Sequence, residues 1–201
     1  MKGRTHIFII ASCALLIIFS GCSWMYEVGH SSEFDATEAG LTVPDFSYTN
    51  QENESFSRAD LDGQYWLASF AFTSCTTVCL TMIPNMRYLQ TQLQKDNVNI
   101  HFVTFSVDPE KDTPAHLKQY TDNINAATDQ WSFLTGYDVE TIVDFSAEGF
   151  RSPVAHGDTP EEVVHSTSFF LINGDHEVVR RYNGLELDQS DIIADIKQTV
   201  Q

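Results

Sequence analysis

Two cysteines, Cys75 and Cys79, stand four positions apart in the segment FTSCTTVCLTM. The apolar run YWLASFAF precedes them, and the apolar residues that follow have helical spacing. We therefore expect the pair at the start of a helix, where unpaired N–H groups and the positive end of the helix dipole favour a thiolate. Positions i and i+4 share one helix face, so the sulfurs are expected to converge on one point. Such a pair suits a metal ion, a redox reaction or a disulfide.

The spacing of the pair favours a metal ion. Thioredoxin-type redox motifs are C-x-x-C, and the extra residue here widens the separation of the sulfurs. Thiolates are soft ligands that select copper(I) or zinc, but two of them leave the ion under-coordinated. A third ligand is expected from His165, which begins the apolar segment STSFFLIN, because in a thioredoxin-like sheet the loop before this strand adjoins the cysteine loop. His156, in an acidic loop, is the weaker candidate.

Alternating strands and helices must position these residues. After a β-hairpin in residues 43–64, the pattern predicts an α/β fold of the thioredoxin-like type, with a central mixed sheet and helices on both faces. The expected strands cover residues 65–72, 98–108, 131–136, 165–173 and 177–184, and the expected helices cover residues 81–97, 112–124, 138–150 and 190–200.

The N-terminus has the layout of an export signal. Residues 1–22 begin with basic residues, continue as an apolar run and end in FSGC at Cys22. This ending resembles a bacterial lipoprotein signal, in which the cysteine is lipid-modified, although Phe19 stands where leucine is usual. An ordinary cleaved signal and an uncleaved anchor are the alternatives. Residues 23–42 read as a flexible tether and residues 43–201 as the domain. All three alternatives place the domain outside the cytoplasmic membrane.

Composition narrows the function classes. The chain has 201 residues, enough for one domain with appendages, and a formal net charge of −17. This charge argues against nucleic acid as a partner and against electrostatic docking on anionic lipid. With Cys13 in the signal and Cys22 assigned to lipid, Cys75 and Cys79 are the only thiols of the expected domain. Outside the cytoplasm such thiols oxidise unless a metal or a reductant holds them.

Four segments together resemble the SCO/SenC family of copper proteins, over about residues 43 to 201. They are FAFTSCTTVCLTM, VTFSVDPEKDTPAHLKQY, VVHSTSFFLIN and YNG. The resemblance implies a thioredoxin-like fold and one copper ion per chain, bound by Cys75, Cys79 and His165. It also implies a membrane-anchored metallochaperone, whose partner is the copper-accepting subunit of cytochrome c oxidase.

The chain departs from the family pattern at two positions next to expected ligands. Leu80 stands where many members have proline, and Val164 stands where many have aspartate. Neither change removes a ligand, but each affects how its neighbour is held. Asp108 in SVDPEKDTP is a candidate for the surroundings of the copper site, although Asp-Pro is also ordinary turn chemistry.

Other functions are compatible with the same cysteines. A thiol–disulfide oxidoreductase that keeps oxidase cysteines reduced is the main alternative, and a copper sensor has the same sequence features. A peroxidase matches only in part, because Phe72 stands where that pattern requires proline. A structural Cys75–Cys79 disulfide is the remaining hypothesis, and a bridge between residues so close on a helix start is strained.

Overall fold

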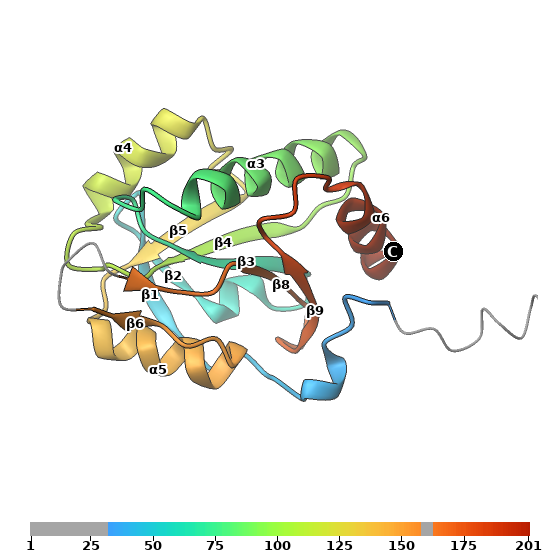
Figure 1. The fold of residues 1–201 in the computed structure, drawn as a ribbon, viewed down its shortest axis with the longest axis horizontal. Helices are drawn as coiled ribbons and strands as arrows, with labels where there is room; N and C mark the ends of the chain where they lie inside the picture. The colour runs from blue at the N-terminus through green and yellow to red at the C-terminus, as the bar shows by residue number, and fades with distance from the viewer. Residues whose placement is uncertain (1–31, 158–162) are drawn as a thin grey trace, which may run out of the picture. The chain divides into compact units, whose positions relative to one another are not determined.

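The computed structural model describes residues 32–157 and 163–201. Its centre is a seven-stranded mixed sheet with the strand order β2-β1-β5-β4-β3-β8-β9 (Figure 1). The strands are β1 (Ser47–Asn50), β2 (Ser55–Ser57), β3 (Trp66–Ala71), β4 (His101–Ser106), β5 (Trp131–Thr135), β8 (Ser168–Ile172) and β9 (Val178–Asn183). A separate two-stranded ribbon pairs β6 (Ala155–His156) with β7 (Val163–Val164).

The middle of the sheet is parallel and its edges are antiparallel. Strand β3 pairs in parallel with β4, from Trp66 opposite His101, and β4 pairs in parallel with β5. On its other side β3 pairs antiparallel with β8, with Trp66 opposite Ile172. Every residue of β3 is buried, as expected for a central strand covered on both faces. This arrangement confirms the predicted thioredoxin-like mixed sheet.

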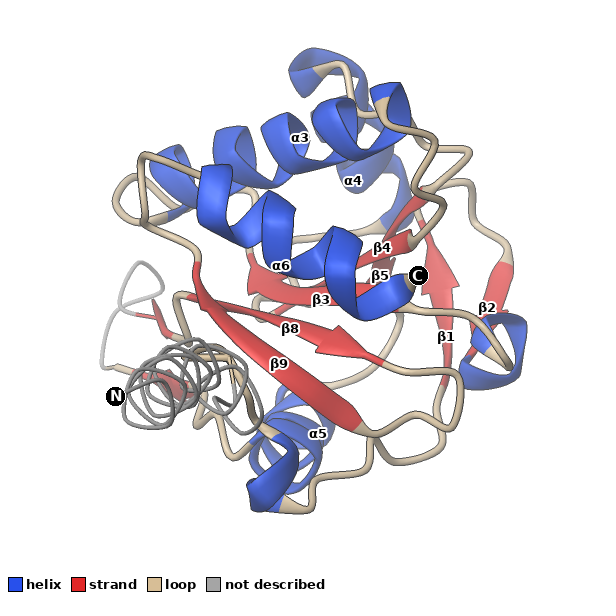
Figure 2. Cartoon of the chain, turned by 90° about the vertical axis from the view of Figure 1, so that its right-hand side faces the viewer, coloured by secondary structure: helices blue, strands red, loops and turns tan. Residues whose placement is uncertain are grey.

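Helices cover both faces of the sheet. The helices are α3 (Cys79–Lys95), α4 (Pro114–Ile124), α5 (Val139–Phe150) and α6 (Ser190–Val200). Helices α3, α4 and α6 lie on one face and α5 on the other (Figures 1 and 2). Thr113 caps α4 by accepting a hydrogen bond from the His116 backbone N–H, and Pro114 occupies the first helical position. On the α5 face, Phe145 and Phe150 pack against Phe105.

The predicted N-terminal hairpin is confirmed. Strands β1 and β2 pair antiparallel, and Asn50 closes their turn by accepting hydrogen bonds from the backbone of Glu52 and Glu54. The hairpin does not stand apart from the sheet, because β1 also pairs with β5 through Thr49 and Thr135. It therefore extends the sheet by two strands.

The compact unit begins earlier than predicted. The sequence assigned residues 34–42 to a flexible tether, but in the structure this segment is attached to β9. Asp35 forms an isolated bridge with Arg180, and the Phe34 ring lies 5.0 Å from the ring of Tyr182. Residues 34–201 form one compact unit. The tether prediction is thus wrong for residues 34–42, because an apolar Phe34 and backbone pairing hold them, which their polar composition did not indicate.

The export signal, Cys22 and residues 23–31 of the predicted tether lie outside the described residues. Within the described ranges, no helix combines the length and apolarity that a membrane span requires.

Candidate metal and redox site

The cysteine loop connects the end of β3 to the start of α3. The backbone N–H of Cys75 donates to the carbonyl of Phe72 at 3.2 Å, so the chain turns directly after the strand. Helix α3 begins at Cys79 itself. Only Cys79 is therefore helical, and the expectation that both cysteines share one helix face is wrong. A turn in the loop, rather than helical periodicity, brings Cys75 to Cys79.

His165 meets this pair from the loop before β8. Its Nε2 lies 3.5 Å from the Sγ of Cys79, across 86 positions of sequence. Its Nδ1 lies 2.9 Å from the carbonyl oxygen of Ser166. Because a carbonyl only accepts, Nδ1 carries the proton and Nε2 presents its lone pair to the sulfur in the neutral ring. Burial lowers the pKa of His165, partly offset by the Ser166 carbonyl, which favours this neutral form.

Cys75, Cys79 and His165 form a group with metal-ligand geometry. Their ligand atoms all lie within 4.8 Å of one another. Metal–thiolate bonds are about 2.3 Å and metal–imidazole bonds about 2.0–2.1 Å in zinc sites, so one ion can reach three atoms so placed. All three residues are buried, with exposed fractions of 8%, 3% and 9%. Within the part of the chain that the structure describes, this is the one such group of histidine, cysteine or acidic residues.

The two thiols differ in acidity. Burial acts to raise the pKa of Cys75, but hydrogen bonds from the Cys79 thiol and from the loop outweigh it, so the net shift is downward. Burial raises the pKa of Cys79 far above its ordinary value, and donating to Cys75 raises it further. Cys75 is consequently the sulfur that deprotonates first, and Cys79 holds its proton until a metal or a base replaces it.

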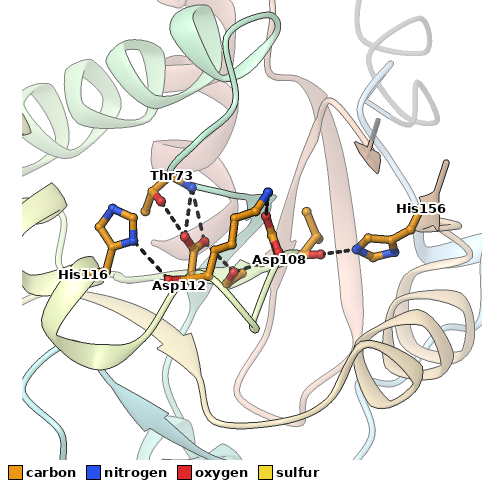
Figure 3. A network of polar contacts seen from close by, with 8 residues as sticks. Thr73, Asp108, Asp112, His116 and His156 are labelled. Atoms are coloured by element: carbon orange, nitrogen blue, oxygen red, sulfur yellow. Dashed lines mark hydrogen bonds and ion pairs between the residues drawn. The ribbon is translucent and has the colours of Figure 1, made fainter. Parts of the chain in front are cut away.

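Asp112 anchors the cysteine loop, a role that the sequence did not reveal. Its carboxylate is fully buried and accepts from the backbone N–H and hydroxyl of Thr73, at 3.2 Å and 2.5 Å, and from the Ser106 hydroxyl at 2.6 Å (Figure 3). Burial raises the pKa of Asp112, opposed by these hydrogen bonds. Thr73 lies two residues before Cys75, so the carboxylate ties the loop to the end of β4.

Asp108 and His156 lie outside the three-residue group. Asp108 is buried and forms an ion pair with Lys111 at 3.0 Å, in the turn that leads to α4. His156, on β6, has its Nε2 2.8 Å from the carbonyl oxygen of Val107. Figure 3 shows both side chains engaged in these contacts. The structure therefore brings His165 to the cysteines, and not His156.

The two departures from the family pattern share a property. Leu80 follows Cys79 and Val164 precedes His165, and each is 67% exposed. Phe72, at the position where the peroxidase pattern requires proline, packs edge-on against the His165 ring with 5.8 Å between centroids. The candidate ligands are thus buried, with His165 against an aromatic ring, and the two helix and strand neighbours Leu80 and Val164 are exposed apolar side chains.

Solved structures of similar proteins carry the same fold. A SCO1/SenC family lipoprotein from Bacillus anthracis str. Ames is 38% identical, with a TM-score of 0.76, covering 80% of this chain and 96% of that chain. BsSco, described as having a disulfide switch and as a member of the Sco family of cytochrome c oxidase assembly proteins, is 37% identical, with a TM-score of 0.73, covering 80% and 94%.

A third structure contains the metal. ScoI of Bradyrhizobium japonicum, solved with copper bound, is 25% identical, with a TM-score of 0.66, and the match covers 78% of this chain and 98% of that one. The family model for SCO1/SenC matches residues 34–201, which is the whole compact unit. By sequence, fold and the presence of the Cys-Cys-His group, this chain belongs to the SCO1/SenC family.

Proposed function

We propose that this chain is a copper chaperone, which binds one copper ion through Cys75, Cys79 and His165 and delivers it to the copper-accepting subunit of cytochrome c oxidase. The observation that supports this most is the convergence of the three ligand atoms within 4.8 Å, in a family with a copper-bound member. Two soft sulfurs favour copper(I), and the imidazole also accommodates copper(II).

The site suits a cargo that must later leave. Its ligands are close to the surface and bordered by exposed side chains, so an incoming thiol can replace one ligand at a time. Binding requires that the Cys79 thiol lose its proton, whose pKa is raised by burial. Copper affinity should therefore fall as the pH is lowered. The neutral His165 needs no deprotonation and is ready to bind.

We also infer that the domain faces outward from the cytoplasmic membrane, anchored by lipid on Cys22. The charged, apolar and small-residue layout of residues 1–22 supports this, as does the description of the Bacillus anthracis relative as a lipoprotein. Mass spectrometry of the N-terminal peptide tests this anchor and should find a diacylglyceryl group on Cys22. In membrane fractionation, the Cys22→Ser chain should be released from membranes. An unmodified Cys22 refutes the anchor.

Copper binding by the full chain, purified in detergent and reduced under anaerobic conditions, tests the chaperone proposal. We expect one copper per chain and a thiolate-to-copper(II) charge-transfer band when copper(II) is bound. Cys75→Ser and His165→Ala should each lose tight binding. His156→Ala is the matched control and should keep it, because His156 contacts Val107 and not the cysteines. Absence of tight copper in the wild-type chain would refute the proposal.

A thiol–disulfide oxidoreductase is the second candidate, favoured by the opposite pKa shifts of the two thiols and by the disulfide switch described for BsSco. His165 separates the candidates. His165→Ala should abolish tight copper binding but only change the rate at which the Cys75–Cys79 disulfide exchanges with a dithiol. If that variant retains both full copper binding and full exchange, His165 serves neither function.

A further inference from the structure

A groove opens beside the copper site, between α3 and α4. Its volume is about 340 Å³. Cys79, Ile83 and Arg87 line it at successive four-residue steps of α3, and Tyr120 and Ile124 line it from α4. Both helices lie on the same face of the sheet (Figure 1). Because Cys79 forms one end of this groove, the groove is a surface path that reaches a proposed metal ligand.

Exposed apolar side chains adjoin two of the three proposed ligands in the chain. Among the described residues, four large apolar side chains are exposed, and two of them, Leu80 and Val164, adjoin Cys79 and His165 in the chain. A third, Tyr88, lies two helical turns beyond Leu80 on α3. Exposed apolar surface concentrated at one site indicates a contact surface for another molecule.

Arg87 gives the far end of the groove a charge. Within the described ranges it forms no ion pair, and its helix neighbours three and four residues away are uncharged, namely Ile83, Pro84, Gln90 and Thr91. On α4, the carboxylate of Asp122 is paired with Lys118 at 3.3 Å. In a chain with a net charge of −17, Arg87 is therefore a cation available to an acidic group of a partner.

We propose that this groove docks an extended segment of the copper acceptor, which presents a thiol to Cys79, an apolar side chain to Ile83 and a carboxylate to Arg87. The inference rests on the proposed chaperone function. Arg87 lies eight residues from Cys79, about 12 Å along the helix axis. An extended segment covers this distance in roughly four residues. The fitting segment thus carries its acidic residue about four positions from its cysteine.

In this docked arrangement, the thiol of the segment replaces Cys79 as a copper ligand in a single step. The incoming thiol loses its proton as its sulfur binds copper(I), and the departing Cys79 sulfur takes up a proton as its copper bond breaks. Copper keeps its charge, and no oxidant or reductant is consumed. The groove supplies the orientation, because side chains on α3 and α4 hold the segment on either side of the sulfur.

Synthetic decapeptides test the proposal on the full chain in detergent. The first peptide has one cysteine, an adjacent leucine and a glutamate four residues after the cysteine; the second has lysine in place of the glutamate. Copper transfer is followed from the copper(I)-loaded chain to a fluorescent peptide. Docking is measured separately on the metal-free chain by fluorescence anisotropy, with serine in place of the peptide cysteine. The docking measurement therefore does not depend on copper. The copper stoichiometry of the chain tests the proposed chaperone function independently.

Charge reversal in the groove gives the decisive comparison. Arg87→Glu should weaken docking of the glutamate peptide about tenfold and slow copper transfer to it. For the lysine peptide, the same variant should restore both docking and copper transfer. Copper stoichiometry should not change. Lys95→Glu, at the C-terminal end of the same helix, makes the same charge change outside the groove and should leave docking unaltered. Equal effects of the two variants, or no effect of Arg87→Glu, would overturn the proposal.

Discussion

Two buried histidines stand at opposite ends of β8, and they have different partners. His165 precedes the strand and His176 follows it, and both are less than 10% exposed. His165 donates from Nδ1 to a backbone carbonyl and turns Nε2 toward the Cys79 sulfur. His176 uses Nε2 instead, which lies 2.7 Å from the carboxylate of Asp62.

The difference shows that burial does not identify a ligand. His176 holds a tight turn with a φ of 64°, and its carbonyl accepts from the backbone N–H of Val43. Its ring nitrogen is occupied by a carboxylate, so it joins the β8–β9 turn to the loop before β3. The unprotonated ring nitrogen of His165 faces the Cys79 sulfur instead of a carboxylate. What separates a candidate ligand from a structural histidine is thus the chemistry of the partner.

The carboxylates near the two ends of β8 also differ in the groups that they contact. Asp62 is exposed and bonds directly to its histidine. Asp112 is fully buried and does not touch His165; it holds Thr73, and through Thr73 the cysteine loop. At the His176 end a carboxylate stabilises the histidine itself. At the His165 end, a carboxylate fixes the backbone from which the sulfurs project.

The largest expected effect is on copper affinity. His165→Gln should lower the affinity by at least about a hundredfold, because even groups that only orient a ligand account for 10–100-fold. Unfolding should change little, since glutamine has a similar volume. Competition with a chelator of known affinity, together with thermal unfolding of the metal-free chain, measures both. A His165→Gln chain that keeps its copper would remove the distinction between the two histidines.

A substitution of the other histidine, His176, should affect the stability of the fold and not copper binding. His176→Asn tolerates the positive φ but loses the bond to Asp62, so the free energy of unfolding should fall by about 1–3 kcal/mol. Copper affinity should stay at the wild-type level. Urea titration measures the free energy of unfolding, and chelator competition measures the copper affinity. If copper affinity falls together with stability, the His176 end is coupled to the copper site and the comparison fails.

A third effect concerns the two thiols of the metal-free, reduced chain. The pKa of Cys75 is lowered and that of Cys79 is raised, so as the pH rises Cys75 reaches the reactive thiolate form first. Each unit of pKa difference changes the thiolate fraction about tenfold, so iodoacetamide should modify Cys75 at least about tenfold faster near neutral pH. Peptide mass spectrometry over time shows the order. Equal rates would contradict the proposed asymmetry.

The smallest effect should come from the loop anchor. Asp112→Asn keeps the size of the side chain but cannot accept from all three donors, so the cysteine loop should loosen. Copper affinity should fall a few-fold, less than the roughly tenfold minimum for groups that orient a ligand directly. The charge-transfer band of the copper(II) form should shift or broaden, which a purely structural role leaves unchanged. Thr73→Ser, which keeps the hydroxyl, should behave as wild type, and Thr73→Val should resemble Asp112→Asn.

Sequence reasoning located the three candidate ligands because their positions depend on regular patterns. The helical and strand periods predict which segments pair, and a strand–cysteine–helix order places the loop before β8 next to the pair. Hence His165 could be expected beside Cys79 although 86 positions separate them. The fold class and the hairpin followed from the same periods.

Other features had no local pattern. Asp112 stands in an ordinary helix-start sequence, and only the fold brings it to Thr73, 39 positions away. Residues 34–42 read as polar tether because their composition does not show that Asp35 pairs with Arg180 of β9 and Thr42 with Glu177, the residue before β9.

The sequence by itself therefore determined the types of the candidate ligands, their spacing and the succession of strands and helices along the chain, since these depend on residue chemistry and backbone period. Only the tertiary structure decided which sulfur is the more acidic, which carboxylate anchors the loop and where the groove beside Cys79 runs. These properties depend on burial and on contacts between residues far apart in the chain. The spacing of residues along the sequence does not determine such contacts.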